Sequence, residues 1–300
     1  MRIAVTGASG FVGGATADRL AALGHEVIGF GRTPHGWSGG EYEVWDLTDG
    51  PRVREVDAVV HAAALADDWA PLRKSRAANV EGTRSMIASF PGARIVHLST
   101  SSVYDARTPT VLAREIAPVP HRFLSTYSRT KAEAELLLEG RDAAILRPHA
   151  VYGPGDTTLL PRILEGIRGS RLVLPAGARV LHTLTHIGNL VTAIEAALES
   201  RARGIFNIGD ARPVVLADVL VELLDRQGRA DVALAGIPYP LAFAAAAALE
   251  ATHAVVGGRP RLTRYAVSQL GMERTLDLSA AREQLGFVPF ATTLEGAERW

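Results

Sequence analysis

Short apolar runs alternate with helical segments through the first half of the chain. Runs rich in Val and Ile, bounded by turn residues, predict strands over residues 2–7, 25–31, 56–64, 93–100 and 143–148. The segment 11–24 predicts a helix that Gly24 ends, and residues 84–90 form the end of another. Apolar strands that alternate with helices indicate a parallel sheet with helices on both faces.

The pattern loosens after Gly153. We expect helices within residues 153–167 and 191–200, a late strand over 204–210, and mainly helical structure in about the last ninety residues. A second, smaller lobe is therefore expected from the C-terminal half.

A glycine-rich loop, TGASGFVG at residues 6–13, joins the first predicted strand to the first helix. Gly7 allows a tight turn, Gly10 lets the backbone approach a pyrophosphate, and Gly13 permits close packing of helix and sheet. The N-terminus of the following helix supplies N–H donors and a favourable dipole. This context favours a dinucleotide site over a turn that merely contains spare glycines.

The end of the second strand distinguishes the two nicotinamide cofactors. An acidic residue there would accept the ribose hydroxyls of NAD, but the strand ends in Gly31-Arg32-Thr33 and has no carboxylate. The planar guanidinium of Arg32 matches the 2′-phosphate of NADP. We therefore favour NADP, with NAD as the alternative if Arg32 is only a solvated loop charge.

Composition excludes several classes of protein. Lys+Arg and Asp+Glu are equal at 32 each, so no net charge favours nucleic acid or an anionic membrane. Cysteine is absent, which excludes disulfides, thiol nucleophiles and Cys-ligated metals and fits a cytoplasmic location. The N-terminus does not resemble a signal peptide. The apolar segment 241–256 is interrupted by Glu250 and His253, so we expect a buried helix and no membrane span.

Tyr127 and Lys131 are four residues apart in a predicted helix, a spacing that often occurs by chance. Together with the other motifs, in this order, the pair resembles the catalytic YxxxK of the extended short-chain dehydrogenase/reductase superfamily, which contains the NAD-dependent epimerases and dehydratases. Further segments resemble its motifs over most of the chain: Asp46-Leu47, His61-Ala62-Ala63-Ala64, Asn79-Val80-Glu81-Gly82-Thr83, LSTSSVY (98–104) and LRPHAVYGPGD (146–156).

The resemblance implies an α/β fold with two lobes. One is a Rossmann domain, a doubly wound parallel sheet that binds NAD(P), from residues 1–151 and about 182–212. The other is a smaller, mainly helical substrate-binding lobe from about 152–181 and 213–300.

The resemblance also implies site residues. Tyr127 would transfer the proton on the substrate oxygen, and Lys131 would lower the pKa of Tyr127 and bind the nicotinamide ribose. The third catalytic position matches Thr100, with Ser101 as the alternative. Cofactor contacts are implied for these residues: Gly7, Ser9, Gly10, Phe11, Val12, Gly13, Arg32, Asp46, Leu47, Ala62, Ala63, Ala64, Asn79, Tyr127, Lys131, Pro148 and Val151. In some members the position of Asn79 relays protons or positions water.

Three features bear on the reaction. Related dehydratases carry an Asp-Glu pair after the catalytic Thr, where this chain has Ser101-Ser102, so dehydration is not expected. UDP-sugar enzymes commonly have an Arg where this chain has His182, with Arg179 three residues earlier, which weakens that alternative. Residues 67–71, 237–256 and 258–287 resemble the 3β-hydroxysteroid dehydrogenase-like branch, which includes β-keto-acid reductases. An apolar lobe fits an apolar substrate, unless its alanines only pack the helices.

For the substrate we expect contacts with Trp69, Ser101, Ser102 and His149, although Trp69 is equally explained as a packing anchor. The scattered histidines show no metal-binding spacing, so no metal site is expected, and His97 in a strand pattern is expected to be a satisfied interior residue. The leading hypothesis is a cytoplasmic, homodimeric NADP-preferring oxidoreductase that interconverts a ketone and a secondary alcohol. The dimer would use helices near 71–89 and 126–139. Alternatives are a nucleotide-sugar epimerase with tightly bound NAD and a non-catalytic cofactor-sensing regulator.

Overall fold

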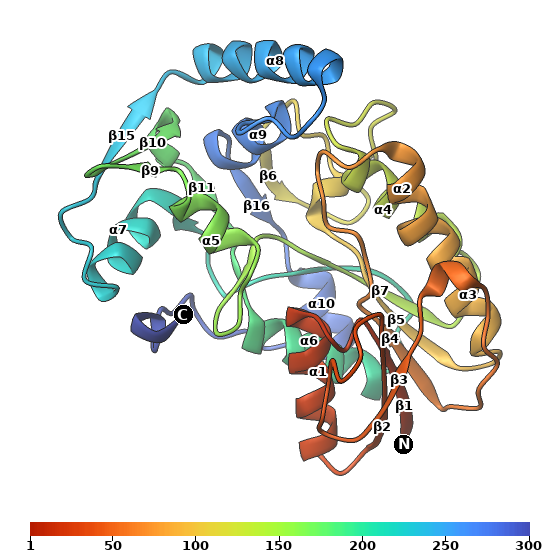
Figure 1. Ribbon diagram of the computed structural model, residues 1–300. Coiled ribbons are helices and arrows are strands. Elements are labelled where there is room, and N and C mark those ends of the chain that lie inside the picture. Colours follow the sequence, from red (N-terminus) through yellow and green to blue (C-terminus); the bar gives the residue numbers. More distant parts are fainter.

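A seven-stranded parallel sheet forms the centre of the computed structural model, which describes residues 1–300 (Figure 1). Its strands are β1 (Arg2–Thr6), β2 (Glu26–Gly31), β3 (Glu41–Val44), β4 (Ala58–His61), β5 (Arg94–Leu98), β7 (Ala143–Pro148) and β13 (Gly204–Ile208). They are ordered β13-β7-β5-β4-β1-β2-β3. The predicted parallel sheet is confirmed, with one additional strand, β3, at its edge.

Helices cover both faces of the sheet, as Figure 1 shows. One face carries α1 (Phe11–Ala22), α6 (Ile187–Glu199) and α10 (Ser279–Leu285); the other carries α2 (Leu72–Arg76), α3 (Gly82–Ser89) and α4 (Thr126–Leu136). Alternation along β1 explains the two layers, because Ile3 and Val5 join one core cluster and Ala4 joins the other.

The strand order reverses at β1, which lies between β2 and β4. In an open parallel sheet, ligands bind outside the carboxyl ends of the strands at such a reversal. The glycine-rich loop follows β1, Ala62 follows β4, and Thr100 lies two residues after β5. Because β1, β4 and β5 are neighbours, these segments meet at one edge of the sheet.

The C-terminal half adds a region of mixed secondary structure rather than a mainly helical one. Its helices are α5 (Leu159–Leu164), α7 (Leu216–Arg226), α8 (Tyr239–Val256) and α9 (Arg264–Gly271). Three small sheets contain one strand from the N-terminal half, β6 (Thr110–Ala113). Their other strands are β8 (Val151–Tyr152), β9 (Ile167–Arg168), β10 (Arg171–Pro175), β11 (Leu181–His182), β12 (Thr185–His186), β14 (Val214–Val215), β15 (Ala233–Ile237) and β16 (Arg274–Leu276). Strands this short carry too few residues to show an alternating pattern.

The division into two lobes stays a prediction at its expected boundaries. A separate core of 16 buried residues contains Leu160, Leu174 and Leu220, all from the C-terminal half. However, Ala281 and Leu285 of α10 belong to the same core as β1 and α6. The chain therefore returns to the central sheet near its C-terminal end.

Helix α8 packs on α9 and extends along the edge of the molecule (Figure 1). It buries Ala242, Ala246 and Glu250, whereas Leu241 and Val255 are exposed. The expected burial therefore holds for one face only. By length and composition alone, α8 is apolar enough to cross a membrane.

Candidate active site

The glycine-rich loop is packed too closely to accept side chains at two positions. A Cβ on Gly7, whose φ is +77°, would lie 2.8 Å from the Ala63 nitrogen, and one on Gly13 would lie 2.1 Å from the Gly7 carbonyl oxygen. A Cβ on Gly10 would meet only the Gly7 carbonyl oxygen, at 3.3 Å, so space remains beside this residue. No side chain caps α1, so its first-turn amides are available to a phosphate. This loop fits the pyrophosphate of a dinucleotide.

The residues expected at the adenosine end lie around the ends of β2 and β3. Arg32 is exposed, and Ser9 packs beside Gly31, where a Cβ would approach its Oγ to 2.6 Å. The Asp46 carboxylate accepts hydrogen bonds from the Thr48 nitrogen and Oγ1 at 2.9 and 2.8 Å. These bonds, and more weakly Arg32, lower the pKa of Asp46. An exposed guanidinium beside a hydroxyl fits a phosphate on the ribose.

Tyr127 and Thr100 approach each other at the carboxyl edge of the sheet. Tyr127 lies in the first turn of α4, which Ser125 caps by accepting a hydrogen bond from the Ser128 nitrogen at 3.1 Å. Thr100 caps the 3₁₀ turn Ser101–Val103 and accepts from the Ser102 nitrogen at 3.1 Å. Two separate capped turns therefore fix the phenol and the hydroxyl.

Burial raises the pKa of Tyr127 above its ordinary value, and the nearby Tyr265 raises it further, while the Thr100 hydroxyl lowers it. The pKa of Tyr127 is therefore not lowered in this structure, because loss of water around the phenol outweighs its hydrogen bond. The expected lowering of this pKa by Lys131 stays a prediction. The phenol is protonated at neutral pH.

Lys131 lies one helical turn after Tyr127 and is buried. Its ammonium donates to the Leu98 carbonyl at 2.5 Å and lies 3.3 Å from the His97 Nε2. Burial lowers the pKa of Lys131 to about 8, against the opposing effect of Glu135. The buried site therefore binds the proton of Lys131 less tightly than water does.

Two buried imidazoles lie beneath Lys131. His61 bonds to Thr6 Oγ1 at 2.7 Å and Thr83 Oγ1 at 3.1 Å, and its ring centroid is 5.2 Å from that of His97. Burial lowers both pKa values, so both rings are neutral. His97 is interior, as predicted, but it is not fully satisfied because its Nδ1 has no partner.

The two serines after Thr100 contact different side chains. Ser101 Oγ lies 3.0 Å from the His149 Nδ1, and the His149 Nε2 lies 3.0 Å from the His182 Nδ1. Ser102 Oγ instead lies 2.7 Å from the Tyr265 hydroxyl. His149 is buried and lies beside the Ser101 hydroxyl; its contact with the substrate stays a prediction.

Asn79 connects the cofactor edge to the catalytic helix. Its Oδ1 accepts from the Leu65 nitrogen at 2.7 Å, and its Nδ2 donates to the Leu65 carbonyl at 3.2 Å and to Thr130 Oγ1 at 2.9 Å. It lies in a π-helical turn, Ala77–Glu81, between α2 and α3. These contacts hold the segment after Ala64 against α4; a proton relay through Asn79 stays a prediction.

The remaining predicted residues lie around this edge. Phe11 and Val12 form the first turn of α1, Leu47 is buried beside Gly82, and Pro148 ends β7. Val151 begins β8 and packs against the core beneath the sheet. Trp69 donates from Nε1 to the Gly258 carbonyl at 2.9 Å, so it contacts the C-terminal region, as a packing anchor would.

Tyr265 is the site residue that the sequence did not indicate. It lies 163 positions after Ser102, in α9, and no motif spacing relates the two. Only the folded chain brings its phenol to Tyr127.

Comparison with known proteins agrees with this geometry. Residues 3–209 match the family described as NAD dependent epimerase/dehydratase family. The chain belongs to this family. It is an NAD(P)-dependent dehydrogenase/reductase of the extended short-chain type.

Several relatives of this family member align over nearly its whole length. A 4-hydroxy-2-methyl-3-oxo-4-farnesyl-3,4-dihydroquinoline-1-oxide ketoreductase from Stigmatella aurantiaca is 32% identical over 99% of this chain and 95% of its own. A 2-alkyl-3-oxoalkanoate reductase from Stenotrophomonas maltophilia is 32% identical over 100% of this chain and 98% of its own. A 3-beta-hydroxysteroid dehydrogenase from Mycolicibacterium neoaurum is 26% identical over 97% of this chain and 88% of its own.

Solved structures of the family share the fold. The UDP-glucuronic acid 4-epimerase from Bacillus cereus in complex with NAD superposes with a TM-score of 0.75 at 20% identity, covering 99% of this chain and 96% of that one. At this identity the likeness establishes the fold alone.

Proposed function

We propose that this protein interconverts a ketone and a secondary alcohol on a mainly apolar substrate and prefers NADP to NAD. The observation that carries the proposal is the approach of the Tyr127 phenol to the Thr100 hydroxyl, with Lys131 one helical turn away. Two hydroxyl groups at one point suit a carbonyl oxygen, which accepts one hydrogen bond from each.

Each residue has a separate role in the proposed reduction. Thr100 holds the carbonyl oxygen, and Tyr127 transfers its phenolic proton to that oxygen. The bound cofactor supplies the hydride that reduces the carbonyl carbon. The Lys131 ammonium stabilises the phenolate that remains. The phenol is protonated at neutral pH even at its ordinary pKa, and burial only strengthens this, so the resting site holds the form that reduction needs.

The names of the relatives favour an apolar ketone, because they describe reductases of 3-oxo compounds and a dehydrogenase of a 3-hydroxysteroid. The state of His182 argues against a sugar nucleotide. Burial lowers its pKa to about 3, so the imidazole is neutral and cannot neutralise a diphosphate.

Three finer points belong to the same proposal. Arg32, exposed at the end of β2, supports the preference for NADP. A homodimer through α2, α3 and α4 is consistent with Leu136 of α4, whose side chain is exposed. The absence of cysteine supports a cytoplasmic location.

Nicotinamide absorbance during turnover tests the proposal. The purified protein receives NADPH or NADH with apolar 3-oxo compounds and 3-oxosteroids, and the corresponding alcohols with oxidised cofactor. UDP-sugars are scored separately for inversion. We expect NADPH consumption with an apolar ketone and a loss of at least about 100-fold in Tyr127→Phe. Inversion of a UDP-sugar without net redox change would replace this proposal with the epimerase alternative.

A further inference from the structure

A second phenol reaches the catalytic turns from the C-terminal region. The Tyr265 hydroxyl, on α9, lies 2.7 Å from Ser102 Oγ. The same hydroxyl is hydrogen-bonded to the Ser128 side chain. Because a phenol can donate one hydrogen bond and accept others, a single oxygen can bridge two serines. Tyr265 therefore connects two segments of the chain that meet at the candidate site.

The two serines belong to the turns that carry the catalytic hydroxyls. Ser102 lies in the 3₁₀ turn that Thr100 caps, and its backbone nitrogen donates to Thr100 Oγ1 at 3.1 Å. Ser128 directly follows Tyr127 in the first turn of α4, and its Oγ lies 2.8 Å from the Oγ of the capping Ser125. A displacement of either serine would therefore displace the catalytic hydroxyl of the same turn.

Substrate binding breaks a second, direct link between these turns. In the resting site the Tyr127 and Thr100 hydroxyls share a hydrogen bond. Each hydroxyl has one proton, and in the proposed reduction both protons are donated to the carbonyl oxygen. The bond between the two hydroxyls is then lost. The bridge through Tyr265 uses neither of these protons, so it persists when a carbonyl oxygen is in place.

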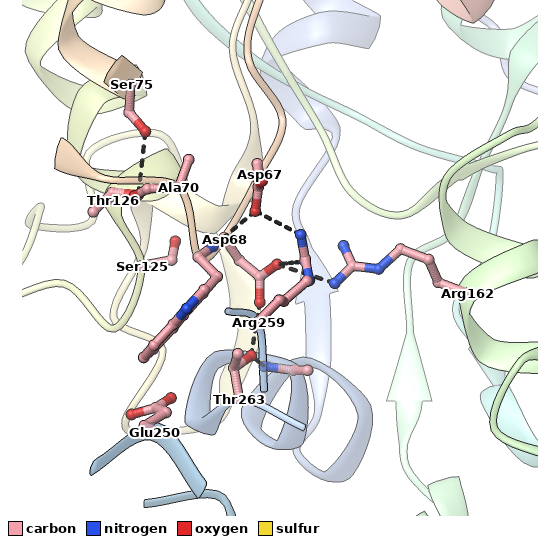
Figure 2. A network of polar contacts seen from close by, with 12 residues as sticks. Asp67, Asp68, Ala70, Ser75, Ser125, Thr126, Arg162, Glu250, Arg259 and Thr263 are labelled. Carbon is pink, nitrogen blue, oxygen red and sulfur yellow. Dashed lines mark hydrogen bonds and ion pairs between the residues drawn. The ribbon is translucent and has the colours of Figure 1, made fainter. Parts of the chain in front are cut away.

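A polar network around Asp68 holds the N-terminus of α9, two residues before Tyr265 (Figure 2). Thr263 caps α9 and donates from Oγ1 to Asp68 Oδ2 at 2.7 Å. Asp68 lies between β4 and α2, is buried, and also pairs with Arg162, at 3.0 Å, and with Arg259. Figure 2 shows both guanidinium groups pointing at this carboxylate. The start of α9 is therefore joined to the segment that follows β4.

A second contact holds the residue directly before Tyr265. The Arg264 backbone nitrogen and Nε both donate to the Glu250 carboxylate of α8, at 2.7 and 2.6 Å. Glu250 is buried, as Asp68 is. Two buried carboxylates therefore fix the backbone that leads into Tyr265. A side chain supported in this way holds its own partners in place more precisely than a mobile one does.

We propose that Tyr265 is a positioning residue of the proposed reaction. Its hydroxyl bridges the turns that carry Thr100 and Tyr127 and keeps the two catalytic hydroxyls at the separation that a carbonyl oxygen requires. This inference rests on the proposed ketone chemistry and adds to it a residue that acts through Ser102 and Ser128 and not on the substrate. It assigns the C-terminal region a part in placing the catalytic hydroxyls.

Steady-state kinetics of the variant Tyr265→Phe, which removes only the hydroxyl, test the positioning role. The substrate is the apolar ketone that the wild type reduces fastest with NADPH. Rates are referred to the concentration of cofactor-binding sites, so that a poorly folded fraction does not count. We expect kcat to fall roughly 10- to 100-fold and KM to change by less than about 3-fold, because misplaced reacting groups slow the chemical step while the substrate contacts remain.

A second variant breaks the bridge at its other end. Ser128→Ala should also lower kcat and leave KM nearly unchanged, and it keeps the test valid if Tyr265→Phe folds poorly. Because either substitution already removes the bridge, the double variant should have a kcat within about 3-fold of that of Tyr265→Phe. Tyr239→Phe is the matched control. Tyr239 lies in α8, which packs on α9, and its ring stacks on Phe243, so its kcat should change by less than about 2-fold.

The outcomes separate this inference from the proposed function. An active wild type with an unchanged kcat in either single variant overturns the positioning role and leaves the ketone chemistry standing. A loss that appears in KM and not in kcat also overturns it, because Tyr265 then holds the substrate. Losses that multiply in the double variant overturn the bridge, since the two hydroxyls then act independently. A wild-type enzyme that turns over no ketone or alcohol overturns the proposed function and this inference together.

Discussion

The buried charge of Lys131 should make the stability of this protein depend on pH in a defined way. The pKa of this ammonium falls from 10.5 to about 8 on burial. The unfolded chain therefore binds this proton more tightly than the folded chain does, so stability rises with pH across that interval. The penalty is fully present below about pH 8 and disappears as the pH approaches 10.5.

The magnitude follows from the same two values. Each tenfold weakening of proton binding corresponds to about 1.4 kcal/mol, so the charged form costs the fold roughly 3 kcal/mol. Between about pH 6.5 and about pH 9.5, wild-type protein should gain about 2 kcal/mol relative to Lys131→Met, which has no ammonium to titrate. Effects of the substitution that do not depend on pH cancel in this comparison.

Urea unfolding at a series of pH values measures the difference. The matched control is Lys74→Met, because Lys74 is the other lysine of the chain and is exposed on α2. An exposed ammonium keeps its water in the folded state, so the control curve should run parallel to that of the wild type. Parallel curves for wild type and Lys131→Met would refute the claim that burial strains this charge.

Three further predictions follow from the loop, the second strand and the catalytic helix. Arg32→Ala should lower kcat/KM for NADPH roughly 10-fold and change NADH by less than about 2-fold; equal losses would contradict a phosphate contact. Gly13→Ala places a Cβ 2.1 Å from a loop carbonyl oxygen, so cofactor affinity in a fluorescence titration and Tm should both fall. Glu135→Gln removes the carboxylate whose Oε2 lies 2.5 Å from the Nη2 of the buried Arg147. It should lower the free energy of unfolding, measured in urea, by about 3 kcal/mol or more. Glu133→Gln, on the exposed side of the same helix, is its control and should cost about 1 kcal/mol or less.

The central sheet was predictable because its strands are buried on both faces. Ile3, Ala4 and Val5 are each fully buried, and a strand of this kind appears in the sequence as a continuous apolar run. Strand β3 lies at the edge and has no buried residue, so Glu41–Val44 shows no such run. The short strands of the C-terminal half were missed for a related reason: tertiary packing selects their pairing, and two to five residues carry little local preference.

The residues of the candidate site also divide into those that the sequence indicates and those that it does not. Gly7, Thr100, Tyr127 and Lys131 lie in local motifs whose spacing is set by one turn or one helix, so the sequence indicates them. Tyr265 reaches Ser102 from α9, whose N-cap residue Thr263 donates to Asp68 in the segment after β4. A contact made by segments this far apart depends on the whole packing, and no short pattern encodes it.

The opposite pKa shifts of Tyr127 and Lys131 have a single physical cause and a common consequence. Burial raises the pKa of the phenol and lowers that of the ammonium to about 8, because it disfavours both charged forms. In the proposed reaction the phenol must be protonated before it donates, and the ammonium must be charged when a phenolate is left behind. At neutral pH the site meets both requirements: the phenol keeps its proton, and the ammonium remains charged only at a cost to the fold. A change that exposed this pair to water would relieve that cost and return the pKa of the phenol towards its ordinary value, at which it is still protonated at neutral pH. Because one burial causes both shifts, such a change would reduce the two shifts together.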